Sequence, residues 1–237
     1  MKKKKAALLF SGGQDSTTAL GWCLNKFDDI HLLSFDYGQR HNIELKSAKR
    51  IVKEIEKNFD LDTTKISKSL IIKIRNLANI TKSSLTSNLK IDTSKKIPNT
   101  FVPGRNLLFY NLASSYAYTN NIENIVSGVC QTDFSGYPDC RDVTIKTLNK
   151  AINLGMEKKF LFHTPLMFLS KAETWKLSYT IGGEKFVNII KKYTHTCYKG
   201  ERKKLFSWGY GCNKCPACSI RKKGWDEYNL KKNDIQC

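Results

Sequence analysis

Short apolar runs and longer amphipathic stretches alternate along the first part of the chain. Residues 6–10 form a continuous apolar run that ends at two glycines after one serine, and residues 31–35 repeat the apolar signal, which predicts two buried parallel strands. Residues 16–26 have helical composition. In residues 42–57 the apolar positions suit one helical face and the charges suit the other. The chain is therefore predicted to begin strand, helix, strand, helix.

The same alternation returns later in the chain. Residues 106–119 and 143–154 are predicted helices, and residues 125–129 and 161–165 are predicted short strands. This alternation predicts an α/β fold, an open parallel sheet flanked by helices and Rossmann-like in type. Residues 62–100 are rich in Ser, Thr, Asn and Lys and have weak periodicity, so we expect an irregular excursion there.

Length and hydropathy favour one substantial domain outside the membrane. A chain of 237 residues buries roughly 70% of its unfolded surface, so neither a metal nor a disulfide is required merely to fold it. No apolar run approaches the roughly 20 residues of a membrane span, and the Lys-rich start lacks the features of a signal peptide. We therefore expect a cytoplasmic protein without a membrane partner.

The formal net charge of +19 raises the question of nucleic-acid binding. Lys greatly outnumbers Arg, and Ile and Asn are abundant, which indicates a compositional bias of the whole chain. Because Arg is favoured over Lys where geometry matters, a solvated Lys-rich surface is the simpler explanation of the charge. We expect no obligatory nucleic-acid partner, and a non-catalytic nucleic-acid binder stays open as an alternative.

A Gly-rich loop follows the first predicted strand and enters a helix at once. Its glycines allow backbone N–H groups to converge on an anion, its hydroxyls donate, and the helix N-terminus adds positive potential. The Gly-Lys-Ser/Thr ending of a Walker loop is absent. The alternative is a tight turn in which Asp15 or Ser16 caps the helix. The candidate nucleotide-binding residues are Phe10, Ser11, Gly12, Gly13, Gln14, Asp15, Ser16, Thr17, Thr18, Ala19 and Leu20.

Three further polar segments follow predicted strands or open a predicted helix. Residues 34–41 follow the second strand, at the carboxyl edge of the sheet where ligands gather in open parallel sheets. Residues 101–106 form a stiff turn that presents Arg105 at a helix start, and residues 133–141 combine two carboxylates with Arg141. An ordinary polar loop is the alternative for each segment.

Cysteines near the end of the chain have metal-ligand spacing. Cys212, Cys215 and Cys218 stand at two successive C-x-x-C steps, and Cys197 supplies a candidate fourth thiolate. Zn²⁺ takes four such ligands tetrahedrally in structural sites. An iron–sulfur cluster is the competing interpretation, although the closing Cys-Pro of a ferredoxin run is missing. His195 is a candidate replacement for Cys197.

The loop of residues 11–16 resembles the PP-loop of the N-type ATP pyrophosphatases, which grips the leaving pyrophosphate while the α phosphate is attacked. This resemblance implies AMP as a product and places Asp15 to help hold Mg²⁺ with the nucleotide. With the three polar segments and the cysteine cluster, the chain is similar over residues 6–225 to the 7-cyano-7-deazaguanine synthase (QueC) family of the queuosine pathway. The spacing between Cys197 and Cys212 is longer than the family pattern leads us to expect.

The resemblance implies an organisation and a set of bound groups. The fold would be of the adenine nucleotide alpha hydrolase type, with residues 1–195 forming the ATP pyrophosphatase domain and residues 196–237 a zinc-binding segment packed on it. ATP, Mg²⁺ and one Zn²⁺ per chain would be the cofactors. The implied zinc ligands are Cys197, Cys212, Cys215 and Cys218. We also expect a homodimer.

The chemistry implied by the resemblance is that of an ATP-dependent carbon–nitrogen ligase. The substrates would be 7-carboxy-7-deazaguanine and ammonia, joined through adenylated intermediates to give 7-cyano-7-deazaguanine. Asp15, Arg105 and Arg141 are the candidate catalytic residues, with one of the two arginines meeting the substrate carboxylate. Lys171, at a predicted helix start, is either a solvated Lys or a phosphate contact. A PP-loop tRNA thiolase that uses the cysteine cluster is the alternative function.

Overall fold

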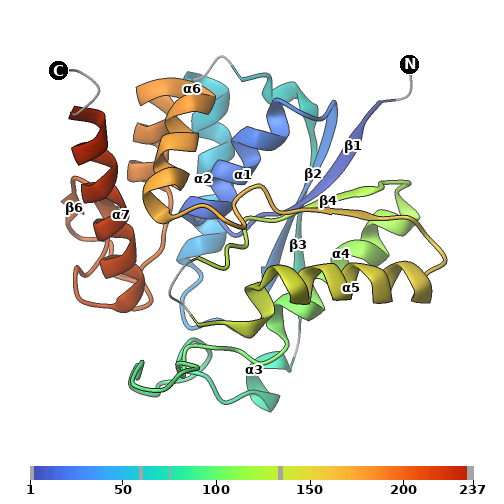
Figure 1. The fold of residues 1–237 in the computed structure, drawn as a ribbon, viewed down its shortest axis with the longest axis horizontal. Helices are drawn as coiled ribbons and strands as arrows, with labels where there is room; N and C mark the ends of the chain where they lie inside the picture. The colour runs from blue at the N-terminus through green and yellow to red at the C-terminus, as the bar shows by residue number, and fades with distance from the viewer. Residues whose placement is uncertain (1–2, 59–60, 75, 133–135, 234–237) are drawn as a thin grey trace.

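The computed structural model describes residues 3–58, 61–74, 76–132 and 136–233. Within these ranges the chain forms a five-stranded parallel sheet, a two-stranded antiparallel ribbon and helices on both faces of the sheet (Figure 1). The strands are β1 Lys5–Leu9, β2 Asp29–Asp36, β3 Ile66–Lys73, β4 Asn124–Val126, β5 Leu161–His163, β6 Leu205–Phe206 and β7 Gly209–Tyr210. The α-helices are α1 Gln14–Leu24, α2 Ile43–Asn58, α3 Leu77–Ile80, α4 Arg105–Thr119, α5 Asp142–Gly155, α6 Lys171–Tyr193 and α7 Pro216–Asn233.

The strand β1 lies at the centre of the sheet, whose order is β3-β2-β1-β4-β5 with every pair parallel. Leu8 of β1 is in register with Leu32 of β2 and Val126 of β4, and all three side chains are fully buried. Continuous apolar runs are typical of such strands because helices cover both of their faces. The predicted open parallel sheet is confirmed.

Helices cover both faces of the sheet (Figure 1), and an apolar core lies on each face. On one face, Leu8 packs with side chains of α1, α2, α6 and α7, including Trp175 of α6. On the other face, Ala7 and Ile125 pack with side chains of α4 and α5, including Tyr110. Successive residues of one strand therefore point to opposite faces of the sheet and pack against different helices.

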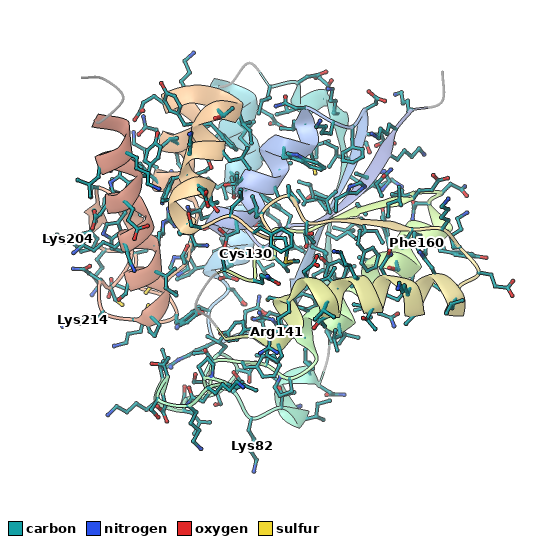
Figure 2. The ribbon with its side chains drawn as sticks, viewed as in Figure 1. Lys82, Cys130, Arg141, Phe160, Lys204 and Lys214 are labelled. Carbon is teal, nitrogen blue, oxygen red and sulfur yellow. The ribbon has the colours of Figure 1, made fainter. Side chains whose placement is uncertain are left out.

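Polar and apolar side chains separate between the interior and the surface. Figure 2 shows Phe160 within the molecule, where it is fully buried, whereas Lys82, Lys204 and Lys214 point outward and are exposed. Lys-rich composition is thus accommodated by solvated side chains at these positions. No helix in the described ranges is long and apolar enough to cross a membrane.

The strand β3 corrects the expectation of irregular structure in residues 62–100. It pairs in parallel with β2 and forms one edge of the sheet. Most of its side chains are exposed, including Leu70 and Ile71, so its sequence lacks the buried apolar signature by which the central strands are detected. Its place in the sheet depends on backbone pairing with β2.

The helices α6 and α7 form one side of the larger core. Helix α6 begins at Lys171, as predicted, with a capping box in which the Ser170 side chain accepts from the Glu173 N–H and Glu173 accepts from the Ser170 N–H. It kinks at Gly182 and Gly183, which leave helical backbone geometry. The charged sequence of α7 gave no helix prediction, and its apolar contacts to α6 stabilise it.

A leucine pair tests the position of the larger core. Leu24 near the end of α1 is 1% exposed, and Leu154 near the end of α5 is 80% exposed. We expect Leu24→Ala to lower the free energy of unfolding by about 3 kcal/mol, because it leaves a cavity. Leu154→Ala should change it by less than about 0.5 kcal/mol. Equal effects in urea titrations of the two variants would contradict this packing.

Candidate active site and metal centre

A cavity of about 330 Å³ opens over the carboxyl ends of the parallel strands. Open α/β sheets bind ligands at the point where the strand order reverses, and here β2 and β4 lie on opposite sides of β1. The segments that follow β1, β2 and β4 all contribute to the cavity wall, as does the start of α4. Its lining includes Phe10, Ser11, Asp15, Ser16, Phe35, Tyr37, Gln39, His41, Glu44, Arg105, Asn106, Phe109, Tyr110, Ser127, Tyr137, Cys140, His195 and Tyr198.

The Gly-rich loop turns sharply just before the N-terminus of α1. Gly12 adopts a positive φ of 85°. Gly13 is the N-cap of α1 and receives no side-chain cap, so the alternative in which Asp15 or Ser16 caps the helix is wrong. Hydroxyls instead organise the loop: Ser11 Oγ accepts from the Gly13 N–H at 3.2 Å, and Ser16 Oγ accepts from the Gly12 N–H at 3.2 Å. The positive end of α1 therefore points at the loop.

A second cavity, of about 190 Å³, also borders this loop. Its wall includes Ser11, Gly13, Gln14, Asp15, Ser16, Lys171, Thr196 and Arg221. Six residues line both cavities, which therefore adjoin, and they are Ser11, Asp15, Ser16, Glu44, His195 and Tyr198. The remaining predicted nucleotide-binding residues, Gly12, Thr17, Thr18, Ala19 and Leu20, are buried and line neither cavity.

Two positively charged side chains line the second cavity. Lys171 Nζ donates to both carboxylate oxygens of Asp15, at 2.8 and 2.9 Å, and its side chain is only 10% exposed. Arg221 is fully buried, and burial lowers the pKa of its guanidinium to about 10, against the raising effect of Asp15. Sequence left the role of Lys171 open, because nothing local to residue 171 shows that α6 starts beside the loop.

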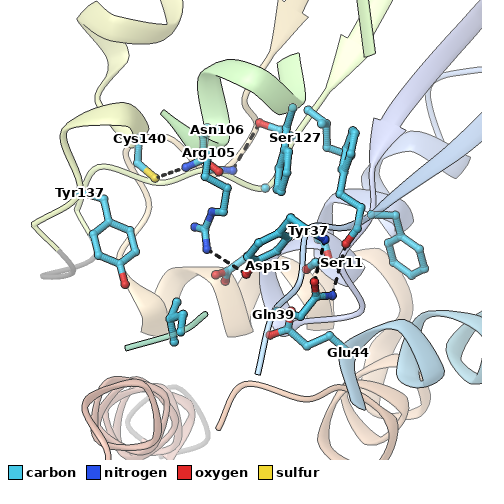
Figure 3. A pocket seen from close by; sticks show the side chains of 18 of the residues that line it. Ser11, Asp15, Tyr37, Gln39, Glu44, Arg105, Asn106, Ser127, Tyr137 and Cys140 are labelled. Carbon is cyan, nitrogen blue, oxygen red and sulfur yellow. Dashed lines mark hydrogen bonds between the residues drawn. The ribbon is translucent and has the colours of Figure 1, made fainter. Parts of the chain in front are cut away.

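Arg105 reaches into the first cavity from the start of α4 (Figure 3). Its guanidinium lies near the rings of Tyr37 and Tyr137, with its central carbon 5.7 and 5.9 Å from their centroids. Nη1 donates to the Tyr37 hydroxyl at 3.4 Å, while the buried Nε has no hydrogen-bond partner among the described residues. An anion in this cavity would give that N–H an acceptor.

Neighbours of Arg105 fix the start of α4. The backbone N–H of Asn106 donates to Asp139 Oδ2 at 3.2 Å, and Asn106 Nδ2 lies 3.1 Å from Cys140 Sγ. These contacts join residues 101–106 to the predicted polar segment 133–141, of which residues 133–135 lie outside the described ranges. Arg141 is exposed and lines neither cavity, so the structure brings together Arg105 and the loop without Arg141.

Aromatic side chains form the wall beyond Arg105. The rings of Phe35 and Phe109 stack with centroids 4.2 Å apart, and Tyr37 packs at an angle to Phe109. Gln39 accepts from the Tyr37 N–H at 2.9 Å and donates to the Phe35 carbonyl at 3.3 Å, which holds the loop after β2 in place. This wall offers a flat apolar surface with polar groups at its edge, which suits a heterocycle.

Glu44 is a cavity residue that sequence reasoning missed. It lies in the first turn of α2 and lines both cavities. Burial raises the pKa of its carboxyl to about 7, against the lowering effect of Arg105. Glu44 comes just after the predicted polar segment 34–41, and this position could have marked it as a candidate site residue. Only the tertiary structure shows that its side chain faces the cavities.

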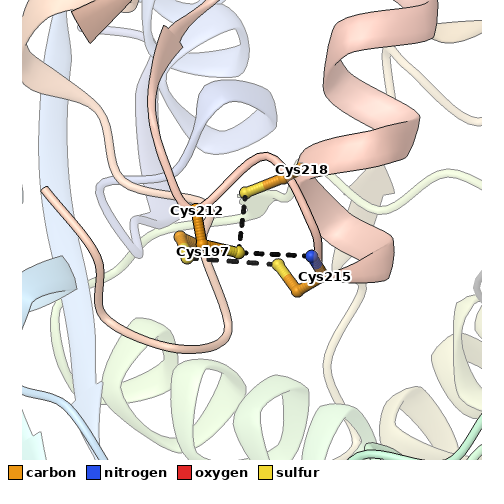
Figure 4. A group of neighbouring side chains, drawn as sticks. All are labelled: Cys197, Cys212, Cys215 and Cys218. Atoms are coloured by element: carbon orange, nitrogen blue, oxygen red, sulfur yellow. Dashed lines mark hydrogen bonds between the residues drawn. The ribbon is translucent and has the colours of Figure 1, made fainter. Parts of the chain in front are cut away.

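Four cysteine side chains point toward one another beside α7 (Figure 4). The Sγ atoms of Cys197, Cys212, Cys215 and Cys218 all lie within 4.8 Å of one another. Four thiolates at about 2.3 Å from one Zn²⁺ have sulfurs about 3.8 Å apart, so this set could hold a single metal ion. His195 is not needed as a ligand, since its Nε2 lies 3.0 Å from the Cys197 carbonyl oxygen.

The thiols of the cluster act on one another. Hydrogen bonds from Cys215 and Cys218 lower the pKa of Cys197 far below its ordinary value, while the pKa of Cys215 rises to about 11. A bound cation would favour the ionised form of all four thiols.

Fold and site together define an α/β protein with a Gly-rich loop of the anion-binding type at the carboxyl edge of its parallel sheet and a four-cysteine cluster that could hold a metal ion. Comparison with known proteins narrows this class. The sequence model of the family described as "Queuosine biosynthesis protein QueC" matches residues 5–229, and the chain belongs to this family. The resemblance seen in the motifs is thereby confirmed.

Relatives from two bacteria carry one name. A 7-cyano-7-deazaguanine synthase of Burkholderia mallei (strain SAVP1) is 47% identical over 227 residues, which are 95% of this chain and 93% of the relative. One from Burkholderia pseudomallei (strain 668) has the same identity and coverage. Both are synthases, so the alternative of a non-catalytic nucleic-acid binder is not supported, and the tRNA thiolase alternative is not favoured.

A solved structure with a similar fold is a complex of a 4-thiouridine synthetase with RNA and bound ATP. It superposes with a TM-score of 0.53 at 14% identity, covering 98% of this chain and 53% of the other. This chain thus spans about half the length of that protein, and the likeness shows the fold alone.

Loss of one thiolate tests the metal centre. We expect the purified chain to carry about one metal ion. Loss of a residue that only supports a metal ligand weakens metal binding by roughly 10–100-fold, and we expect Cys218→Ser, which removes a ligand, to weaken it more. Elemental analysis and chelator competition measure both quantities. Cys23→Ala, at a buried cysteine outside the cluster, should keep the wild-type metal content. Equal metal content in Cys218→Ser would show that the cluster is not the site.

Proposed function

We propose that the chain converts 7-carboxy-7-deazaguanine and ammonia to 7-cyano-7-deazaguanine in an ATP-dependent ligase reaction. A carboxylate is a poor electrophile because its oxygen does not leave. Transfer of AMP to it gives a mixed anhydride, which ammonia converts to an amide, and a second ATP activates the amide oxygen for loss as AMP. Family membership and the two synthases at 47% identity support this chemistry.

The observation that carries the proposal is the meeting of the two cavities at Ser11, Asp15 and Ser16. One cavity has a phosphate loop and cations, and the other has an aromatic wall and Arg105. A nucleotide whose pyrophosphate lies in the smaller cavity would present its α phosphate at the junction. The attacking carboxylate would then approach from the larger cavity, and positioning of the two supplies most of the catalysis.

Different residues of the loop would bind different parts of ATP and its metal ion. Residues 11–16 would hold the pyrophosphate through backbone N–H groups and hydroxyls, with Lys171 as a further cation at the cavity. Asp15 would help hold Mg²⁺ with the nucleotide, since this ion takes one or two carboxylates plus phosphate oxygens. The ion neutralises charge that develops on the leaving pyrophosphate.

Arg105 is the group we assign to the substrate carboxylate. Its Nε–H lacks an acceptor among the described residues, and its guanidinium stands between two tyrosine rings that limit its motion. The stacked pair Phe35 and Phe109 would contact the deazaguanine ring. The alternative prediction, that Arg141 meets the carboxylate, is decided by comparing substitutions of the two arginines.

We propose zinc as the metal of the cysteine cluster. An iron–sulfur cluster distributes its cysteines over several irons, whereas here all four sulfurs lie within 4.8 Å of one another, as around one ion. A colourless protein with one zinc per chain is the expected result. The homodimer, the cytoplasmic location and the division into residues 1–195 and 196–237 also stay predictions.

Product analysis tests the reaction class. With ATP, ammonium chloride and 7-carboxy-7-deazaguanine, the chain should release AMP and pyrophosphate and form the nitrile, because the loop lacks the Walker Lys that serves attack at the γ phosphate. Mass spectrometry and radiolabelled ATP measure the products. ADP and phosphate as products would overturn the proposal.

The two arginines provide a matched pair for the carboxylate contact. We expect Arg105→Lys to lower kcat/KM for the carboxy substrate by on the order of 10²-fold, since one charge-assisted contact contributes about 1.5–3 kcal/mol. Arg141→Lys, at an exposed position, should stay within about twofold of wild type. The reverse ranking in steady-state kinetics would move the carboxylate site to Arg141.

A further inference from the structure

Glu44 occupies the junction of the two cavities. It stands in the first turn of α2, and its side chain extends toward the space below Arg105 and Tyr37 in Figure 3. Of the six residues that line both cavities, Glu44 and Asp15 are the carboxylates. The junction is where the proposed function places the acyl adenylate, so both carboxylates adjoin the reacting atoms.

The two carboxylates have different partners. Asp15 is bonded twice by Lys171. Among the described residues, Glu44 has neither a hydrogen bond to its carboxylate nor a cation within 4.0 Å, and Arg105 acts on it from a longer distance. Withdrawal from water therefore dominates, and the pKa of Glu44 rises to about 7. A carboxylate of this kind exchanges protons readily at neutral pH.

The proposed reaction needs such a group. Ammonia is present at neutral pH almost wholly as ammonium, which has no lone pair and cannot attack the anhydride. It must lose a proton where the anhydride is shielded from water. A carboxylate suits this task for two reasons. It attracts the ammonium cation, and it then accepts a proton from that cation.

We propose that Glu44 is the ammonium site and the proton acceptor of the amide-forming step, an assignment that rests on the proposed function. Ammonium transfers one proton to the Glu44 carboxylate and becomes ammonia. The nitrogen lone pair then forms the C–N bond at the acyl carbon, and the C–O bond to AMP breaks with its electron pair leaving on AMP. A second proton passes from nitrogen to solvent as the amide forms.

The other titratable groups around the junction are less suited to hold a small cation. Tyr37 accepts from Arg105, and the Tyr198 hydroxyl lies 3.3 Å from that of Tyr137. His195 contacts the Cys197 carbonyl through Nε2. The buried Nδ1 of His195 and Nε2 of His41 have no hydrogen-bond partner among the described residues, but a carboxylate carries the negative charge that attracts a cation. With Asp15 paired to Lys171, Glu44 is the carboxylate that remains for a small cation.

The test separates adenylation from amide formation in Glu44→Gln. Carboxylate-dependent exchange of labelled pyrophosphate into ATP needs no ammonium, and we expect it to stay within about threefold of wild type. Amide formation from ammonium chloride should fall by about 10²-fold or more, the range for loss of a general base. Glu56→Gln, on an exposed position of the same helix, should match wild type in both assays.

Hydroxylamine distinguishes proton transfer from a structural role. It is largely unprotonated at neutral pH, so it attacks the anhydride without giving up a proton first, and hydroxamate formation by Glu44→Gln should stay within about threefold of wild type. Equal losses in exchange and amide formation would overturn the assignment, because Glu44 would then serve adenylation. Amide formation at the wild-type rate would overturn it as well. A wild-type chain without carboxylate-dependent exchange would instead overturn the proposed function.

Discussion

The site depends on a backbone contact at Gly12. A Cβ added to this residue would lie 2.5 Å from the Glu44 carbonyl oxygen and 2.7 Å from the Ala48 nitrogen, and the φ of 85° further disfavours any side chain. On its other side the Gly12 carbonyl accepts from the His195 N–H at 3.1 Å. The phosphate loop, the start of α2 and the segment that leads to Cys197 are therefore positioned together, because none moves without the others.

Arg221 connects this contact to the metal centre. Its buried guanidinium donates to the Ile190 and Trp208 carbonyls and to the hydroxyls of Thr194 and Thr196, at 2.9 to 3.1 Å. These four bonds offset the cost of burying the charge. Arg221 lies one helical turn after Cys218 on α7, and Thr194 and Thr196 flank His195, which bonds the loop. A metal at the cysteines would thus brace the end of α6 and, through it, the loop that would hold pyrophosphate.

Sequence predicted the parts of this arrangement whose chemistry is local. The apolar runs of β1 and β2, the loop at residues 11–16 and the cysteine spacing each carry their own signature. The edge strand β3 was missed because its exposed side chains lack an apolar run, and α7 because contacts with α6 stabilise it. In the sequence, Lys171 and Glu44 look like ordinary charged residues on helices. Only the fold brings the starts of both helices to the loop. Their roles come from tertiary contacts that no short motif encodes.

Asp15 and Glu44, the two carboxylates at the junction, have different surroundings, and these suit them to different proposed roles. Asp15 lies beside the cations and is held as an ion pair, which suits an anion that shares Mg²⁺ with phosphates. Glu44 has no cation within 4.0 Å among the described residues, and its pKa of about 7 means that the folded chain binds its proton more tightly than the unfolded chain does. Folding stability therefore declines through Glu44 as pH rises from about 4.5 to 7. A carboxylate that costs stability at neutral pH, at the junction of two cavities, fits the proposed role in proton transfer.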